Sequence, residues 1–200
     1  MKQSILKKLM IIIAMVVLVT GTITACGGGN EVELLSEDEL DGVTFKRGDV
    51  FADMTVTTPD GTTYKISEIL KEKKAVVINF WFLNCDPCRM EFPYMQEAYE
   101  NYQDDIEILA INTYDGKDDT VAEYQKKMEL TFPMAVLDEE WAVRMGVQAY
   151  PTTVIIDRYG IVSFKHTGMI TDVEEFNKLF EFFTADDYEQ TVIKKIDDIK

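Results

Sequence analysis

Two cysteines separated by two residues, Cys85 and Cys88, are the feature of this 200-residue sequence best able to carry chemistry. They follow an apolar run at residues 76–82 and precede a segment with helical character at residues 89–102. The pair therefore lies where a buried strand ends and a helix begins. This context, more than the spacing itself, points to thiol-disulfide chemistry.

The start of a helix gives the two sulfurs different surroundings. Unpaired backbone N–H groups and the positive end of the helix stabilise a thiolate at the outer position, which Cys85 occupies. Cys85 is therefore predicted to be the nucleophile that forms a mixed disulfide with a substrate, and Cys88 the thiol that resolves it. Because these steps also run backwards, the two residues alone do not choose between reduction and oxidation.

Other interpretations of the pair have less support. A zinc site needs four ligands, and beyond the pair only His166 is at hand, so no metal is predicted. A structural disulfide that closes so short a loop adds little stability, and two inert buried thiols fit poorly beside Asp86 and Arg89. His166 lies in a predicted hairpin far along the chain and is interpreted as structural.

The elements that must position the pair alternate between strand and helix patterns. The apolar run before Cys85 lacks alternation, as is typical of a central strand covered on both faces. The predicted strands cover residues 51–57, 62–66, 76–82, 106–112, 133–137, 147–156 and 161–165. The predicted helices cover residues 68–72 after the N-cap Ser67, then 85–102, 118–130, 139–145 and 173–183. This order predicts an α/β sheet with a parallel half and an antiparallel edge.

Pro151 begins a predicted strand, a place where a proline is a candidate for a cis peptide bond. A cis proline near the sulfurs would leave the backbone of Tyr150 free to pair with an extended substrate peptide, as an added strand would. Tyr150 and Pro151 are therefore candidate substrate-binding residues.

The N-terminus has the pattern of an export signal. A short basic segment precedes Leu9–Val19, an apolar run of eleven residues. An ordinary membrane-spanning helix needs about 20, although an uncleaved anchor remains the alternative. Ile23-Thr24-Ala25-Cys26 resembles the bacterial lipobox, which implies cleavage before Cys26 and a diacylglycerol on its sulfur. Two acyl chains suffice for stable membrane anchoring.

The chain is predicted to divide into four parts. The net charge of −16 makes nucleic acid and anionic lipid surfaces poor partners. The Gly-rich and acidic segment after Cys26 is predicted to be a flexible tether. The parts are a signal peptide at residues 1–25, the lipidated cysteine and tether at 26–45, the folded domain at 46–184 and an acidic tail at 185–200.

Residues 81–95 resemble the active-site block of thioredoxin-fold proteins, particularly the TlpA/ResA-like extracytoplasmic thiol-disulfide oxidoreductases. Three motifs carry the resemblance, which extends over about residues 46–184: Asn79-Phe80-Trp81, Glu91-Phe92-Pro93 and Tyr150-Pro151-Thr152. It implies a thioredoxin fold, with a central mixed sheet flanked by helices and an N-terminal β-hairpin extension. It also implies that Cys85–Cys88 is a redox-active disulfide and that Pro151 is cis and faces it.

Glu91 occupies the position at which the family carries a glutamate that handles protons at the pair. Three residues along a helix place it on the side of Cys88, where a carboxylate disfavours a thiolate and is able to accept the resolving thiol's proton. The alternative is an ordinary exposed glutamate. Two positions depart from relatives: Asn84 replaces a tryptophan found in many of them, and Asn79 replaces the buried acid of cytoplasmic thioredoxins.

The resemblance further implies a reductant that is lipid-anchored on the outer face of the bacterial cytoplasmic membrane. Electrons would come from a membrane-integral thiol donor of the CcdA/DsbD type and pass to a protein disulfide, for example in apocytochrome c or a surface methionine sulfoxide reductase. No cofactor is required, because the cysteines carry the electrons. The alternatives are a disulfide-forming oxidase and a lipid-anchored binding module with an incidental Cys-x-x-Cys. A peroxidase has less support, because the threonine-x-x-cysteine context is missing.

Overall fold

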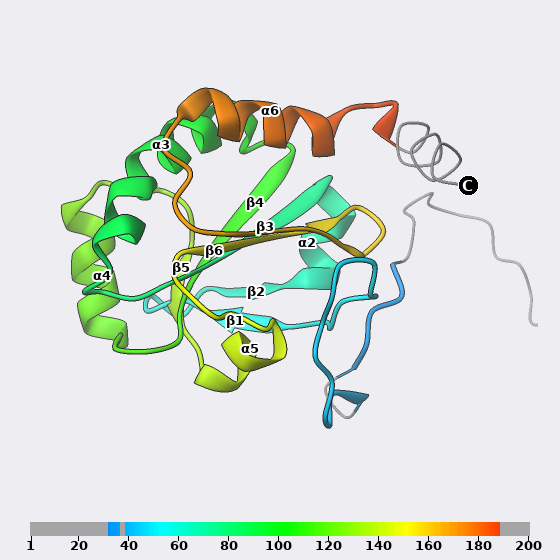
Figure 1. Ribbon diagram of the computed structural model, residues 1–200, viewed down its shortest axis with the longest axis horizontal. Coiled ribbons are helices and arrows are strands. Elements are labelled where there is room, and N and C mark those ends of the chain that lie inside the picture. Colours follow the sequence, from blue (N-terminus) through cyan, green and yellow to red (C-terminus); the bar gives the residue numbers. More distant parts are fainter. Residues whose placement is uncertain (1–31, 37–38, 189–200) are drawn as a thin grey trace, which may run out of the picture. The chain divides into compact units, whose positions relative to one another are not determined.

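The computed structural model describes residues 32–36 and 39–188 (Figure 1). The chain divides into two compact units, residues 1–30 and 31–200, and every described residue belongs to the second. The predicted signal peptide and Cys26 lie outside the described residues. Among the helices that the structure describes, none combines the length and the apolar character needed to cross a membrane.

A five-stranded mixed sheet forms the centre of the described unit, with the spatial order β5-β4-β3-β6-β7. The strands are β3 (Ala75–Trp81), β4 (Ile106–Asn112), β5 (Met134–Val136), β6 (Thr152–Asp157) and β7 (Val162–Thr167). β3, β4 and β5 run parallel, whereas β6 is antiparallel to β3 and β7 is antiparallel to β6. The predicted sheet with a parallel half and an antiparallel edge is confirmed.

β3 lies in the middle of the sheet, and both of its faces are covered. All of its residues are buried. Ala75, Val77 and Trp81 contribute to one apolar core, and the alternate residues Val76 and Ile78 contribute to the other. The absence of polar alternation in this stretch follows directly from burial on two sides.

Helices cover both faces of the sheet. The core that contains Trp81 is covered by α3 (Asp86–Tyr102), α4 (Asp118–Lys127) and α6 (Val173–Thr184), and Figure 1 shows α3 and α6 on the same side. The opposite core receives side chains from α2 (Ile66–Glu72) and α5 (Glu139–Arg144). Burial of the apolar stripe on each helix is what holds these short elements on the sheet.

The predicted N-terminal hairpin is present but shorter than its sequence pattern. β1 (Thr55–Thr57) and β2 (Thr63–Lys65) form a separate antiparallel two-stranded sheet. In the turn, the N–H of Gly61 donates to the carbonyl of Thr58 at 2.8 Å. Gly61 has a φ of 87°, a conformation that favours glycine.

Helix α2 does not start at the predicted cap. Ser67 lies inside its first turn, so the prediction of Ser67 as N-cap is wrong. Asp53 takes this role instead, because its carboxylate accepts hydrogen bonds from the backbone N–H of Ser67 at 2.9 Å and from its hydroxyl at 3.0 Å. Asp53 also pairs with the ammonium of Lys65 at 2.8 Å. The cap therefore comes from a distant part of the chain.

Among the remaining elements, α4 and β6 differ most from the prediction at their ends. α4 ends at Lys127, short of the predicted residue 130. Two residues later, Glu129 has a left-handed φ of 55°, a backbone conformation that is incompatible with continuing the helix. β6 begins at Thr152 and not at residue 147, and the cis Tyr150–Pro151 peptide bond lies just before it.

The segment at residues 32–36 and 39–45 packs against the domain, so the predicted tether is wrong for these residues. Leu40 is 4% exposed and Phe45 is 2% exposed. The N–H of Leu35 donates to the carbonyl of Phe51 at 3.0 Å. The N–H of Phe45 donates to the carbonyl of Arg144 at 2.7 Å. The remaining apolar side chains of this segment are half-buried against the same core, so the packed unit begins before residue 46.

Packing also continues past the predicted domain end at residue 184. Tyr188 is 2% exposed, and its hydroxyl donates to the carboxylate of Asp157 at 2.8 Å. The guanidinium of Arg158 donates to the carbonyls of Phe183 at 3.0 Å and Ala185 at 2.9 Å. The remainder of the predicted tail, residues 189–200, lies outside the described residues.

Candidate active site

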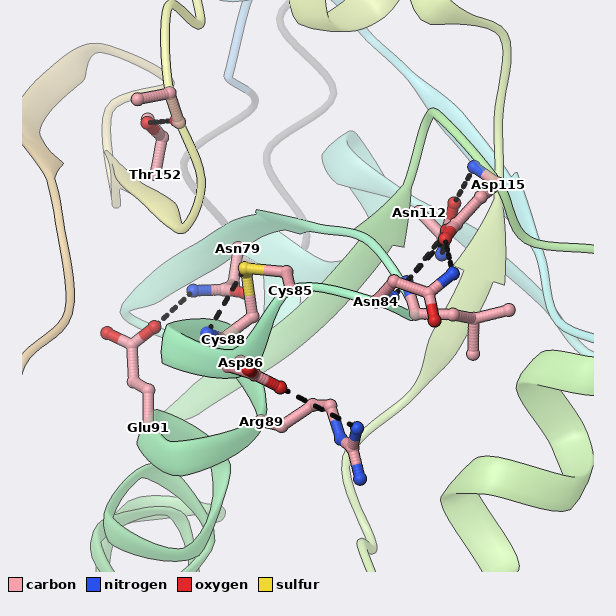
Figure 2. The surroundings of a disulfide bond; sticks show 12 residues. Asn79, Asn84, Cys85, Asp86, Cys88, Arg89, Glu91, Asn112, Asp115 and Thr152 are labelled. Carbon is pink, nitrogen blue, oxygen red and sulfur yellow. Dashed lines mark hydrogen bonds and ion pairs between the residues drawn. A yellow bond between two sulfur atoms is a disulfide. The ribbon is translucent and has the colours of Figure 1, made fainter.

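The Cys85–Cys88 pair forms a disulfide at the start of α3 (Figure 2). Cys85 is the N-cap residue of the helix, and its Sγ accepts a hydrogen bond from the N–H of Cys88 at 3.2 Å. Cys85 is 3% exposed and Cys88 is fully buried, so Cys85 is the more accessible sulfur. The predicted disulfide is present, while its redox activity stays a prediction. The N–H of Cys88, in the first turn of α3, is one of the groups that favour a thiolate at Cys85.

Glu91 lies one helical turn beyond Cys88 and is fully buried, so the alternative of an exposed glutamate is wrong. One carboxyl oxygen accepts a hydrogen bond from the amide of Asn79 at 3.3 Å, and the other accepts one from the N–H of Ile170 at 3.1 Å. Burial raises the pKa of Glu91 to about 7, and these two hydrogen bonds offset the rise only in part.

Asn79 of β3 joins Glu91 to the neighbouring strand. Its amide nitrogen also donates to the hydroxyl of Thr153 of β6 at 3.1 Å, and Figure 2 shows this amide reaching toward the Glu91 carboxylate. Its oxygen is buried and has no hydrogen-bond partner among the described residues. The position that holds an acid in cytoplasmic thioredoxins therefore holds a neutral donor here, and the buried acid is supplied by α3.

The Tyr150–Pro151 peptide bond is cis, as the resemblance implies. Thr152 pairs with Phe80 in the sheet, so Pro151 lies level with the end of β3, where the chain leaves for Cys85. Within the described part of the chain, no residue hydrogen-bonds the backbone N–H or carbonyl of Tyr150. Tyr150 therefore has the free backbone that pairing with an extended peptide requires.

A chain of aromatic contacts connects Tyr150 with a loop that the sequence did not single out. The ring of Phe82 contacts the ring of Tyr150 edge-on, with centroids 5.3 Å apart, and that of Tyr114 at 5.5 Å. Tyr114 is 72% exposed and lies between β4 and α4. The hydroxyl of Tyr150 is also 3.1 Å from that of Thr113. This loop therefore forms a third side of the site, and no motif in the sequence marks it.

His166 pairs with Thr153 in the sheet, and within the described ranges it forms no hydrogen bond or ion pair with Cys85, Cys88 or Glu91. His166 is in β7, exposed, and its ring stacks near that of Phe164 with centroids 6.4 Å apart. In the described ranges, no group of three or more His, Cys, Asp or Glu residues is arranged to hold a metal ion. Cys26, the predicted lipidation site, is outside those ranges.

Comparisons with known proteins agree with this geometry. Residues 47–165 match the AhpC/TSA family. The chain is 34% identical over 127 residues to the thiol-disulfide oxidoreductase ResA of Halalkalibacterium halodurans, a match that covers 61% of this chain and 70% of that protein. It is 29% identical over 154 residues to the thioredoxin-like protein YneN of Bacillus subtilis, covering 76% of this chain and 88% of that protein.

A solved structure shows the same fold. It is a thiol:disulfide interchange protein of the thioredoxin family from Chlorobium tepidum, and it matches with a TM-score of 0.62 at 21% identity. The match covers 71% of this chain and 100% of that one. The thioredoxin fold implied by the sequence motifs is therefore confirmed.

Proposed function

Since the chain belongs to the AhpC/TSA family and is a thiol-disulfide oxidoreductase, we propose that it reduces disulfides in exported proteins while lipid-anchored outside the cytoplasmic membrane. An enzyme of this class uses its dithiol in chemistry, so a binding module with an incidental Cys-x-x-Cys is set aside. The direction of electron flow, the clients and the anchor are the parts that we propose.

The observation that carries the reductive direction is the buried Glu91 beside the pair. A dithiol is a strong oxidant when its thiolate form is stabilised, because this favours the reduced protein. Here a carboxyl group that ionises near pH 7 lies one turn from Cys88, and its charge opposes a second negative charge. The nearest cation in sequence, Arg89, is exposed and pairs with Asp86 at 3.9 Å. This balance favours the disulfide form of the protein and hence the role of reductant.

The proposed cycle balances atoms and electrons with two cysteines. The Cys85 thiolate attacks a client disulfide, a mixed disulfide forms, and the departing client sulfur takes up a proton. Cys88 gives its proton to the Glu91 carboxylate and attacks Cys85, which releases the second client thiol and closes the Cys85–Cys88 disulfide. Two electrons have passed to the client, and Tyr150 and Pro151 hold its extended backbone during the exchange.

The next turnover requires two electrons from another dithiol. We assign this supply to a membrane-integral thiol donor of the CcdA/DsbD type, with apocytochrome c or a surface methionine sulfoxide reductase as candidate clients. The export pattern of residues 1–25 and the lipobox at Cys26 support a location at the outer face of the membrane.

Trapping of clients tests this proposal. In a Cys88→Ala variant expressed in the native host, the resolving thiol is missing, so the mixed disulfides on Cys85 should accumulate and identify the clients. The control is the double variant Cys85→Ala/Cys88→Ala. Recovery of no more protein with the single variant than with the control would contradict a client-directed function.

The reduction potential decides between reductant and oxidase. Equilibration of the Cys85–Cys88 pair with glutathione should give a value near that of thioredoxin, about −270 mV, for a reductant. A value of about −120 mV, typical of a strong oxidant, would instead identify the protein as a disulfide-forming oxidase.

A further inference from the structure

The loop between β4 and α4 is organised by one buried side chain. Asn112, the last residue of β4, is fully buried. Its amide oxygen accepts hydrogen bonds from the N–H groups of Tyr114 at 3.1 Å, Asp115 at 3.2 Å and Gly116 at 2.9 Å. A Cβ atom at Gly116 would lie 2.6 Å from Cγ of Asn112, so the loop closes this tightly only with glycine there. The conformation of the loop is therefore fixed from within.

This loop directs the Asp115 carboxylate at the backbone that leads into Cys85. Its Oδ1 accepts from the N–H of Leu83 at 2.7 Å and from the amide of Asn112 at 3.2 Å. Its Oδ2 accepts from the N–H of Asn84 at 3.3 Å and from the Asn84 side chain at 3.1 Å. Figure 2 shows Asp115 with Asn84 and Asn112. All four donors are neutral, and the described part of the chain forms no ion pair with Asp115.

We propose that Asp115 is a positioning residue of the redox site, which fixes the turn that carries Cys85 and sets a negative charge against its thiolate. Asn84 has a role in this arrangement, because its side chain supplies one of the four donors. The carboxylate opposes the N-terminus of α3, whose N–H groups favour the thiolate. The reactivity of Cys85 then reflects a balance between one loop and one helix.

Other charged groups surround the pair and set the background for this effect. Asp86 and Arg89 are exposed on α3, and Glu91 is buried on the side of Cys88. Asp115 differs from all three because it bonds directly to the backbone one residue before Cys85. A substitution of Asp115 therefore changes the charge near Cys85 and the hydrogen bonds to Leu83 and Asn84, but it alters neither cysteine.

The test compares Asp115→Asn with Asp118→Asn in a Cys88→Ala background. Asp118 is exposed in the first turn of α4, so its substitution changes the net charge equally without touching the turn. The rate of Cys85 alkylation by iodoacetamide at pH 7 is measured by mass spectrometry. Asp115→Asn should raise it about 3- to 10-fold, while Asp118→Asn changes it less than about twofold. Equal rates in the two folded variants would overturn the proposal.

The same substitutions in the chain with both cysteines provide a second readout. Two glutathione thiols reduce the protein disulfide to two thiols and form one glutathione disulfide. Asp115→Asn should shift this equilibrium toward the reduced protein, because loss of the charge stabilises the Cys85 thiolate. A merely structural role would lower stability without this shift.

A measurement on the unaltered chain covers the case in which Asp115→Asn does not fold. The N–H of Leu83 lies outside any strand or helix, so Asp115 alone should protect it from hydrogen exchange, on the order of 100-fold. Exchange at the rate of an unfolded chain would contradict the proposal. The inference rests on Cys85 being the reactive thiol, but alkylation and exchange need no client. Their failure is therefore distinct from a failure of client trapping.

Discussion

At the scale of single residues, Glu91 is the group whose surroundings most affect its chemistry. It is fully buried, and its two described partners, Asn79 and the N–H of Ile170, are both neutral. A buried carboxyl without a cation holds its proton to a higher pH, and so is able to exchange a proton near neutrality. The same burial lowers the free energy of unfolding once the Glu91 carboxyl group is ionised.

Glu91→Gln should therefore stabilise the protein in a pH-dependent way. The unfolded chain loses the Glu91 proton near pH 4.5, whereas burial in the folded protein raises the pKa to about 7. The unfolded state ionises first, so the stability of the wild type falls as the pH rises from about 4.5 to about 7. The shift corresponds to roughly 3 kcal/mol, which the neutral glutamine avoids.

Urea unfolding at pH 4, 6 and 8 measures this difference. Glu97→Gln, an exposed change on the same helix, is the control and should leave the stability nearly unchanged at each pH. A constant gap between Glu91→Gln and the wild type across this range would rule out the assigned ionisation.

The sequence marks the residues of the site that lie in local motifs and misses those that the fold brings in. Cys85, Cys88 and Glu91 share one helix, so their spacing alone relates them. Ile170 meets Glu91 from 79 positions away, and Asp115 meets Leu83 from 32 positions away. Such contacts depend on the register of strands and on loop conformation, which no local pattern encodes.

At the scale of elements, the same distinction separates the presence of an element from its ends. The central strands and long helices carry strong apolar patterns, and each of them appears where these patterns predict it. The ends depend on single contacts from elsewhere, as at Ser67 of α2, where the capping group comes from Asp53. Sequence patterns therefore locate elements better than they locate caps.

Asp53→Ala should destabilise the protein by about 1–2 kcal/mol, the usual effect of removing a helix cap. Burial by itself would raise the pKa of Asp53, but hydrogen bonds from Lys65 and Ser67 outweigh it and lower the pKa below 3.8. The stabilisation should therefore be complete above about pH 4 and decline as the pH falls further.

Urea unfolding at pH 7 and pH 3 checks this expectation. Asp104→Ala, at an exposed position between α3 and β4, serves as the control. Equal midpoints for the two variants at pH 7 would show that α2 does not depend on Asp53.

At the scale of the whole molecule, the described C-terminal residues hold α6 to the turn between β6 and β7. The hydroxyl of Tyr188 donates a hydrogen bond to the carboxylate of Asp157 in this turn, and the guanidinium of Arg158 donates one to the carbonyl of Phe183 near the end of α6. A chain that ends after Thr184 loses the Tyr188 contacts, so its free energy of unfolding should fall by about 3 kcal/mol. A chain that ends after Tyr188 retains these contacts and is the matched control.

Thermal unfolding of the two shortened chains measures the contribution of residues 185–188. The chain that ends after Thr184 should unfold at a clearly lower temperature than the chain that ends after Tyr188. Identical unfolding temperatures for the two would show that Tyr188 does not contribute to the stability of the domain.

The packing of residues 32–45 would also limit how far the enzyme acts from the membrane anchor that we propose at Cys26. Cys26 and Val32 are six positions apart, so the chain between them spans at most about 20 Å in any conformation. A tether that ran free to residue 45 would have allowed roughly 70 Å. With lipid on Cys26, as we propose, the point where the domain begins stays within that short radius of the bilayer surface. Clients would then have to present their disulfides close to the membrane, so the short distance between Cys26 and Val32 would restrict which exported proteins the enzyme reaches.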